Sequence, residues 1–198
     1  MDRVTTVVVS ACWVVVAVVW IAGAVYGAAK GPAVRSRGHG SLPWILAAAG
    51  IWLVVFPHGG RGFDQRLAVH DLGLQAPGIA VVLTATAFTL WARAALGTMW
   101  SWAPVTKEGH QLRTTGPYAI TRHPIYTGLI GMLAGTALAQ GSLLWGVLVL
   151  AVVVGLYGKI REEERLMANQ FPADYPDYRR RVPQLVPGLK ALHGGHAR

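Results

Sequence analysis

The sequence predicts an all-α integral-membrane protein with five transmembrane helices, a cytoplasmic loop and a C-terminal helical segment. Of its 198 residues, 53% are hydrophobic and only 14% are charged, and the mean hydropathy is +0.41. An ordinary soluble domain carries about 25% charged residues, so this composition is typical of a membrane protein. The apolar residues also form five continuous runs, which lack the apolar–polar alternation of a membrane β-barrel.

The first three runs cover residues 4–29, 41–57 and 76–96. The first is longer than the 7–15 or so apolar residues of a secretory signal, so we expect a retained helix that crosses about 30 Å of hydrocarbon. The second is short but can span with a modest mismatch. The third carries Arg93 near its end, where a long side chain can reach the membrane surface.

The fourth and fifth runs, from Pro124 to Ala139 and from Leu143 to Gly158, are separated by only three residues. So short a connection predicts an antiparallel helical hairpin. Valine is abundant in the first and fifth runs and would favour strands in water. In lipid each backbone group must find its partner within the segment, so helices are expected here too.

The positions of lysine and arginine predict the orientation. In a five-span arrangement, 15 of the 18 basic residues lie on the side that holds residues 30–40, 93–123 and the tail from 159 onward. The positive-inside rule therefore puts the N-terminus outside, and the 97–123 loop and the tail in the cytoplasm, for an inner (plasma) membrane protein. With a formal charge of +9, we expect anionic membrane lipids as partners and no nucleic acid.

We expect residues 1–198 to form a single domain, with the N-terminal spans in 1–90, the functional motifs in 91–187 and a disordered tail in 188–198. The single cysteine, Cys12, excludes a disulfide within the chain. The sequence contains no histidine pair at a metal-ligand spacing, no G-x-G-x-x-G fingerprint and no phosphate-binding loop. A bound metal and a soluble Rossmann-type cofactor site are therefore not expected.

Polar residues gather in two cytoplasmic stretches, 107–126 and 159–183, which flank the predicted hairpin and should meet at one membrane face. In the first stretch Pro124 suits the first position of a helix. Arg122 and His123 would then lie at the helix N-terminus, whose free N–H groups can receive a carboxylate. The alternative is an interfacial anchor, with the arginine at headgroup depth and the histidine in solvent.

In the second stretch Glu162, Glu163 and Glu164 directly follow the fifth run. Three adjacent acids cannot share one helix face, so at least one should point toward the first stretch. The alternative is a solvated helix with a Lys159–Glu163 pair worth a few tenths of a kcal/mol. Together the two stretches offer aromatic rings, an imidazole, a cation and a carboxylate, a set that suits a zwitterionic, aromatic small ligand.

The letters HQLRTTGPYAITRHPIYTG, followed after one hairpin by EEERLMANQFPADYPDYRRRVP, resemble the isoprenylcysteine carboxyl methyltransferase family. This wider group includes phospholipid N-methyltransferases and bacterial integral-membrane relatives. The resemblance covers roughly residues 90–187. The combination of G-x-Y-x-x-x-R-H-P-x-Y-x-G with a downstream acidic cluster and Y-x-x-Y is quite specific.

The resemblance implies a cytoplasmic S-adenosyl-L-methionine site. Carried over by motif, the cofactor-binding residues are His110, Gln111, Leu112, Arg113, Tyr118, His123, Pro124, Ile125, Tyr126 and Glu163. The family's basic residue that meets the acceptor falls on Lys159 or Arg161. A glutamine that some members place upstream is Ala103 here, and the run of three acids leaves the register of the glutamate open by one.

The predicted reaction is methyl transfer to a lipophilic small-molecule or lipidated acceptor that enters from the bilayer. A carboxylate acceptor is already nucleophilic and needs no base. An amine, as in a phospholipid N-methyltransferase, must lose a proton, and Glu164 would be the candidate base. Arg122 is the second catalytic candidate. The sequence leaves open whether its side chain lines the pocket, contacts the acceptor or anchors the chain at the lipid headgroups. The alternatives are a non-enzymatic transporter or assembly protein and a nicotinamide-dependent membrane reductase.

Overall fold

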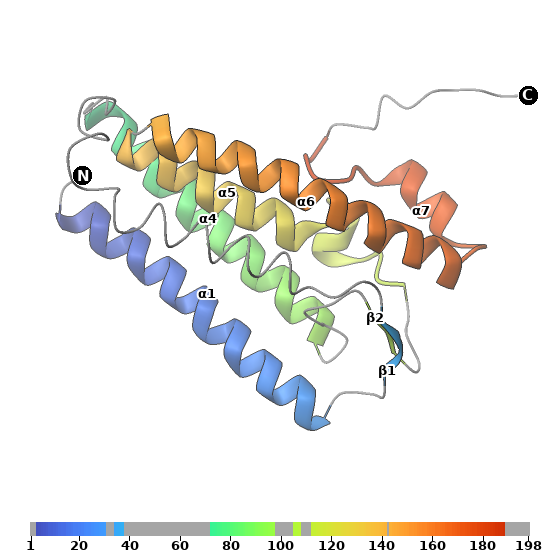
Figure 1. Cartoon of the computed structure of the whole chain (residues 1–198). Helices are drawn as coiled ribbons and strands as arrows, with labels where there is room; N and C mark the ends of the chain where they lie inside the picture. Colours follow the sequence, from blue (N-terminus) through green and yellow to red (C-terminus); the bar gives the residue numbers. More distant parts are fainter. Residues whose placement is uncertain are drawn as a thin grey trace, which may run out of the picture.

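The computed structural model describes residues 3–30, 34–37, 72–97, 105–107, 112–141 and 143–188. This part of the chain is mainly helical (Figure 1). Its elements in order are α1 (Arg3–Lys30), β1 (Val34–Arg37), α4 (Leu72–Leu96), β2 (Val105–Lys107), η2 (Gly116–Ala119), α5 (Pro124–Gln140), α6 (Leu143–Gln170) and α7 (Tyr175–Arg181). The helical prediction is confirmed, and the two short strands are an addition that the sequence did not predict.

Helices α1 and α4 are the described helices that are long and apolar enough to cross a membrane. Their apolar segments are Arg3–Gly27 and Gly73–Leu96. They agree with the first and third predicted spans. The second predicted span, 41–57, lies outside the described residues, as do the residues beyond 188.

One stripe of α1 packs against α4, and the rest of its surface is apolar and exposed. The stripe repeats every three or four residues, as an amphipathic helix requires, and consists of Thr5, Val9, Cys12, Val16 and Trp20. The exposed surface includes Val7, Val14, Val18 and Val25, side chains that a lipid environment would cover.

The helices α1 and α4 run parallel. Near their starts the Thr5 hydroxyl lies 3.4 Å from the side-chain oxygen of Gln75. Near their ends Gly23 packs on Arg93, so that a Cβ at Gly23 would lie 2.0 Å from a guanidinium nitrogen. The end of α1 and the start of α4 are therefore at opposite ends of the pair (Figure 1).

Small residues let α4 and α5 approach each other closely. A Cβ added to Gly128 would lie 1.9 Å from the Thr89 hydroxyl oxygen, and one added to Gly135 would lie 2.8 Å from the Val82 backbone nitrogen. Backbones that touch in this way are typical of helix pairs in membranes. The small residues of α5, Gly131 among them, therefore serve helix packing.

The predicted hairpin of α5 and α6 is present. Gly141 ends α5 in the left-handed conformation, with φ of 61°, which glycine adopts without strain. Trp145 and Leu148 of α6 then pack back on Leu133 and Ala137 of α5. Helix α6 continues to Gln170, well past the predicted apolar span, and so carries the acidic cluster on a rigid helical extension (Figure 1).

Strands β1 and β2 pair antiparallel, with Val34 opposite Lys107 and Arg37 opposite Val105. Their pairing joins the segment after α1 to the segment after α4. The two loops therefore lie at the same end of the helices, which is the arrangement that the count of basic residues predicts.

Candidate functional site

The site is built around the start of α5. His123 caps the helix and Pro124 occupies its first turn, as predicted from the sequence. The short helix η2 leads into this turn and is entered through Gly116, whose φ is 62°. The Tyr118 side chain of η2 is buried, and its carbonyl oxygen accepts a hydrogen bond of 2.8 Å from the Tyr178 hydroxyl of α7.

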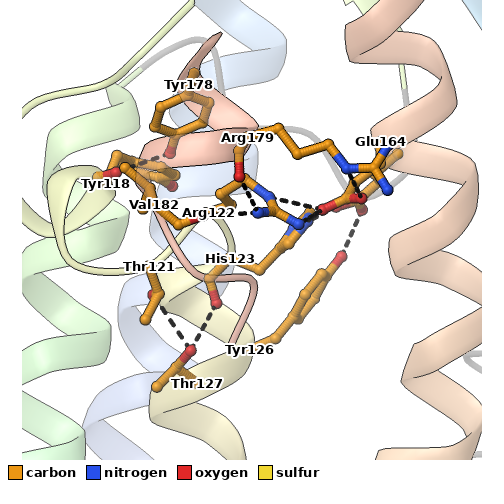
Figure 2. A network of polar contacts seen from close by, with 11 residues as sticks. Tyr118, Thr121, Arg122, His123, Tyr126, Thr127, Glu164, Tyr178, Arg179 and Val182 are labelled. Carbon is orange, nitrogen blue, oxygen red and sulfur yellow. Dashed lines mark hydrogen bonds and ion pairs between the residues drawn. The ribbon is translucent and has the colours of Figure 1, made fainter. Parts of the chain in front are cut away.

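A buried ion pair joins this turn to α6. The Arg122 guanidinium donates to Glu164 Oε1 through Nε at 2.9 Å, and its Nη2 lies 2.7 Å from the same oxygen. Only 4% of the Arg122 side chain and 10% of the Glu164 side chain are exposed, so both charges are largely withdrawn from water. Figure 2 shows the pair at the centre of a network that connects α5, α6 and α7.

His123 lies between two carboxylates. Its Nδ1 is 3.5 Å from Glu163 Oε2 and its Nε2 is 3.4 Å from Glu164 Oε1. A neutral imidazole has a single N–H, so only the imidazolium can donate to both neighbours. Burial alone would lower the pKa of His123, but the hydrogen bonds and charges of Glu163 and Glu164 outweigh it and raise this pKa above its ordinary value.

The same contacts hold Glu164 in its ionised form. Burial would raise its pKa, but hydrogen bonds from His123 and Arg122, together with the Arg122 charge, outweigh this effect and lower the pKa to about 2. A carboxylate that is so weakly basic and already accepts two charged donors is a poor proton acceptor. The geometry therefore favours an ion-pairing role for Glu164 over the general-base role considered from the sequence.

Glu163 has a different environment. Its Oε1 accepts a short hydrogen bond from the Tyr126 hydroxyl, and 25% of its side chain is exposed. The Tyr126 ring stacks on the His123 imidazole at a centroid distance of 5.7 Å. The site therefore combines a partly open carboxylate with a flat aromatic wall.

Of the two basic candidates, Lys159 lies at the site. Its Nζ is 5.5 Å from the centre of the Tyr126 ring, one helical turn before Glu163. The Arg161 guanidinium instead lies 4.6 Å over the ring of Tyr157, a residue that is itself exposed. Of the two candidates, Lys159 is the one whose cation lies over Tyr126, and which of them contacts the acceptor stays a prediction.

Residues 182–185, which we call the C-terminal strap, lie across the start of α5. The Arg122 backbone N–H donates to the Pro183 carbonyl at 2.8 Å, and the His123 N–H donates to the Gln184 carbonyl at 3.1 Å. The strap therefore supplies the acceptors of these two N–H groups, which precede α5. The binding of a ligand carboxylate by free N–H groups of the helix itself stays a prediction.

The Arg122 side chain also forms hydrogen bonds with α7 and the C-terminal strap. Its Nη1 donates to the carbonyl oxygens of Arg179 at 3.0 Å and Val182 at 2.7 Å, in addition to the Glu164 contact (Figure 2). The Thr127 hydroxyl donates to the Leu185 carbonyl at 2.7 Å. An arginine whose donors bind a carboxylate and two carbonyls positions α7 and the strap, and these contacts favour that role over a catalytic one.

An open groove of about 470 Å³ adjoins the network. Its lining residues combine aromatic, acidic and basic side chains, and they are Leu112, Thr114, Phe171, Asp174, Asp177, Tyr178 and Arg181. Tyr178 lines the groove and also belongs to the polar network, because its hydroxyl donates to the Tyr118 carbonyl. Leu112 and Thr114 come from the segment before η2, and the other lining residues come from the turn before α7 and from α7 itself. Among them only Leu112 was predicted as a site residue.

The remaining predicted residues are dispersed. Ile125 packs against the apolar core formed with α1 and α4, so the structure does not bring it to the network. Pro124 is buried and Arg113 is exposed. His110 and Gln111 lie outside the described residues. Within the described ranges, no three His, Cys, Asp or Glu side chains cluster as a metal would require.

Comparison with known proteins identifies the class of protein. The model of the isoprenylcysteine carboxyl methyltransferase family matches residues 78–169, which include α5, most of α6 and the network between them. The solved structure of the eukaryotic intramembrane Ras methyltransferase, an isoprenylcysteine carboxyl methyltransferase, is similar with a TM-score of 0.59 and 25% identity. That match covers 77% of this chain and 55% of the solved one.

Two bacterial relatives are also similar. The cobalt-zinc-cadmium resistance protein CzcN of Cupriavidus metallidurans is 33% identical, with 68% of this chain and 71% of the relative covered. Methanethiol S-methyltransferase 2 of Bradyrhizobium diazoefficiens is 41% identical over 85 residues, or 42% of this chain and 32% of the relative. The chain thus spans about half the length of the solved Ras methyltransferase and about a third of methanethiol S-methyltransferase 2.

The fold, the apolar helices and these matches define an integral-membrane methyltransferase. The chain belongs to the isoprenylcysteine carboxyl methyltransferase family.

Proposed function

We propose that this protein transfers a methyl group from S-adenosyl-L-methionine to a lipophilic acceptor at the cytoplasmic face of the inner membrane. The observation that carries the proposal is the convergence of Glu163, His123 and Tyr126, which come from two helices and form one polar cluster. The resemblance to the family implies that these residues share one site, and their mutual contacts support this.

The donor's chemistry fits the residues present. S-adenosyl-L-methionine, when bound, supplies a methyl group on a sulfonium together with an ammonium, a carboxylate and an adenosyl group. Glu163 would hold the ammonium, since it is a partly open carboxylate. The Tyr126 ring, which stacks on His123, would provide an aromatic face for the sulfonium. The groove that Leu112 and Tyr178 help to line would take the adenosyl group.

The acid–base state of the site favours an acceptor that is already anionic. His123 lies between the carboxylates of Glu163 and Glu164. Glu164 is ionised and paired with Arg122, so it is not prepared to remove a proton near neutral pH. A carboxylate needs no such step: its oxygen forms the new bond to the methyl carbon while the carbon–sulfur electron pair stays on sulfur. We therefore favour carboxyl methylation over methylation of a phospholipid amine.

Lys159 would orient the acceptor carboxylate without protonating it. Its ammonium group lies over the Tyr126 ring, one helical turn from Glu163. Arg122 would act indirectly, by fixing Glu164, α7 and the C-terminal strap. The rate enhancement in this scheme comes from orientation of the two reacting groups.

A thiol is the second candidate acceptor. It is favoured by the 41% identity with methanethiol S-methyltransferase 2 over 85 residues. A thiol also has to ionise before it attacks, and its ordinary pKa of about 8.5 leaves a few per cent of thiolate at neutral pH. That thiolate fraction is intrinsically very nucleophilic, so a thiol can react without a strong base at the site.

We further propose a single domain with five spans, an external N-terminus and a cytoplasmic site. The parallel course of α1 and α4 supports this topology, because the chain between them must return to the other end of the pair. The pairing of β1 with β2 supports it as well, since both strands follow helices that would end in the cytoplasm.

Methyl transfer from labelled S-adenosyl-L-methionine tests the proposal. The full chain in lipid nanodiscs would be offered a prenylated cysteine with a free carboxylate, phosphatidylethanolamine or a long-chain alkanethiol. We expect the label in a base-labile methyl ester. Label in the amine lipid would contradict the preference for a carboxylate, and transfer to none of the three would contradict a lipophilic acceptor of these classes.

A further inference from the structure

We propose that binding of the donor's ammonium group to Glu163 releases one proton from His123. The inference rests on the proposed function, since it takes Glu163 as the ammonium receptor. It makes His123 a positioning residue whose charge state changes during donor binding.

The first argument is geometric. Both nitrogens of the His123 ring face carboxylate oxygens, at 3.5 Å for Glu163 and 3.4 Å for Glu164. The imidazolium therefore occupies the place beside Glu163 Oε2 that an incoming ammonium needs. The other oxygen of Glu163 already accepts the Tyr126 hydroxyl, so the two cations compete for one oxygen.

The second argument is the charge of the surroundings. The imidazolium and Arg122 balance the two carboxylates, and further positive charge comes from Lys159 on α6 and Arg179 on α7. The other groups packed around His123 are Tyr126, stacked on its ring, and Gln184 of the strap, whose side chain hydrogen-bonds Glu164. The donor carries an ammonium, a sulfonium and a carboxylate, so it adds one net positive charge to a set that is already positive. This addition favours loss of the one positive charge that can leave, which is the His123 proton.

The proton balance is simple. In the empty site His123 donates through Nδ1 to Glu163 and through Nε2 to Glu164. After donor binding the ammonium donates to Glu163, and His123 keeps its Nε2 proton and its bond to Glu164. The Nδ1 proton leaves to the cytoplasm. Only 10% of the His123 side chain is exposed. Water therefore cannot fully replace Glu163 as the partner of Nδ1, and the protonated and neutral forms of His123 remain distinct states.

Isothermal titration calorimetry of the full chain in nanodiscs tests this coupling. S-adenosyl-L-methionine would be titrated between about pH 5.5 and 7, below the pKa of about 8 of an α-amino group, so that the donor's own charge stays constant. Each titration would be repeated in two buffers that differ in ionisation enthalpy. We expect release of close to one proton per donor bound, and an affinity that rises up to about tenfold per pH unit.

Two variants sharpen the test. His123→Gln keeps an N–H donor near the carboxylates but has no titratable proton, so the buffer dependence should disappear. Arg161→Gln, whose guanidinium lies over Tyr157, should release the same proton as the wild type. Because the wild-type measurement stands alone, a His123→Gln protein that does not fold leaves the proposal testable.

Three outcomes would contradict the account. Donor binding with no buffer dependence in the wild type would overturn the coupling and leave the proposed function standing. Unchanged proton release in His123→Gln would assign the proton to another group. A folded wild-type protein that binds no donor at any pH would overturn the proposed function together with the coupling.

Discussion

Arg122 and Glu164 stand 42 residues apart in the sequence, yet a guanidinium nitrogen and a carboxylate oxygen of the pair lie 2.7 Å apart and are buried. Arg122 precedes α5 and Glu164 belongs to the extension of α6, so the helical hairpin between them determines their meeting. The pair ties the two polar stretches of the sequence into one site. It also fastens α7 and the C-terminal strap through the remaining donors of Arg122.

Breaking this pair from one side should destabilise the protein. Arg122→Met or Glu164→Leu leaves a buried charge without its partner, which costs roughly 3–5 kcal/mol. Thermal unfolding of the detergent-solubilised protein, followed by near-ultraviolet circular dichroism, would measure the effect as a lower Tm. The double variant Arg122→Met/Glu164→Leu should lose less than the sum of the two. Single variants with the wild-type Tm would contradict a buried ion pair.

The acid stability of the protein should depend on Glu164. Its pKa is lowered from 4.5 to about 2, so its stabilising contribution is complete above about pH 4.5 and is lost as the pH falls through 2. The Tm of the wild type should therefore fall between pH 4.5 and 2, and that of Glu164→Gln should fall less steeply. Parallel Tm profiles for the two proteins would assign the acid transition to other groups.

His123 should produce the opposite dependence at higher pH. Its folded-state pKa is raised, so the stabilisation it gives is present below the unfolded value of about 6.5 and is lost as the pH rises through the folded value. In the absence of donor, His123→Gln should remove this alkaline decrease in Tm. A wild-type Tm that increases as the pH rises from 6 to 9 would contradict the protonated histidine.

The close contact of α4 and α5 makes a matched pair of glycine substitutions informative. Gly128→Ala places a Cβ 1.9 Å from the Thr89 hydroxyl oxygen, whereas Gly146→Ala meets no atom within 4 Å. Overpacking of this kind costs about 1–3 kcal/mol. We expect a lower Tm for Gly128→Ala, partial recovery in Gly128→Ala/Thr89→Ala, and no change for Gly146→Ala. Equal Tm values for the two single variants would show that the helices are not in contact here.

Lys159 and Arg161 should differ in their effect on the acceptor. Only Lys159 lies over Tyr126 beside Glu163, since Arg161 lies over Tyr157. Loss of a charge-assisted hydrogen bond costs about 1.5–3 kcal/mol, so Lys159→Ala should lower kcat/KM for a carboxylate acceptor about 10- to 100-fold. Arg161→Ala should stay close to the wild type. If Arg161→Ala lowered kcat/KM more than Lys159→Ala in a steady-state assay, Arg161 would be the residue that contacts the acceptor.

Much of the helical framework followed from the sequence. The hairpin was predictable because only three residues separate two apolar runs, and the start of α5 was predictable because Pro124 suits a first helical turn. The meeting of His123 with Glu163 followed from the same hairpin. The sequence could not distinguish the roles of Lys159 and Arg161, because both lie on α6 near the acidic cluster and only side-chain direction separates them.

The contacts of the C-terminal strap could not be predicted. Its acceptors are main-chain carbonyls of Pro183 and Gln184, and every residue type carries such a carbonyl. For that reason the sequence did not indicate that the N–H groups of Arg122 and His123 are occupied. The role of Arg122 was open for the same reason, since two of its partners are carbonyl oxygens contributed by residues more than 50 positions away.

The affinity of Glu163→Gln for S-adenosyl-L-methionine tests whether the donor binds between α5 and α6. The substitution keeps the size of the side chain and removes the charge that would hold the donor's ammonium. Calorimetry on the nanodisc-embedded protein should show a Kd about 10- to 100-fold weaker than that of the wild type. Arg161→Gln, the control on the same helix, should bind normally. Equal donor affinity in wild type and Glu163→Gln, with both proteins folded, would contradict a donor site between α5 and α6.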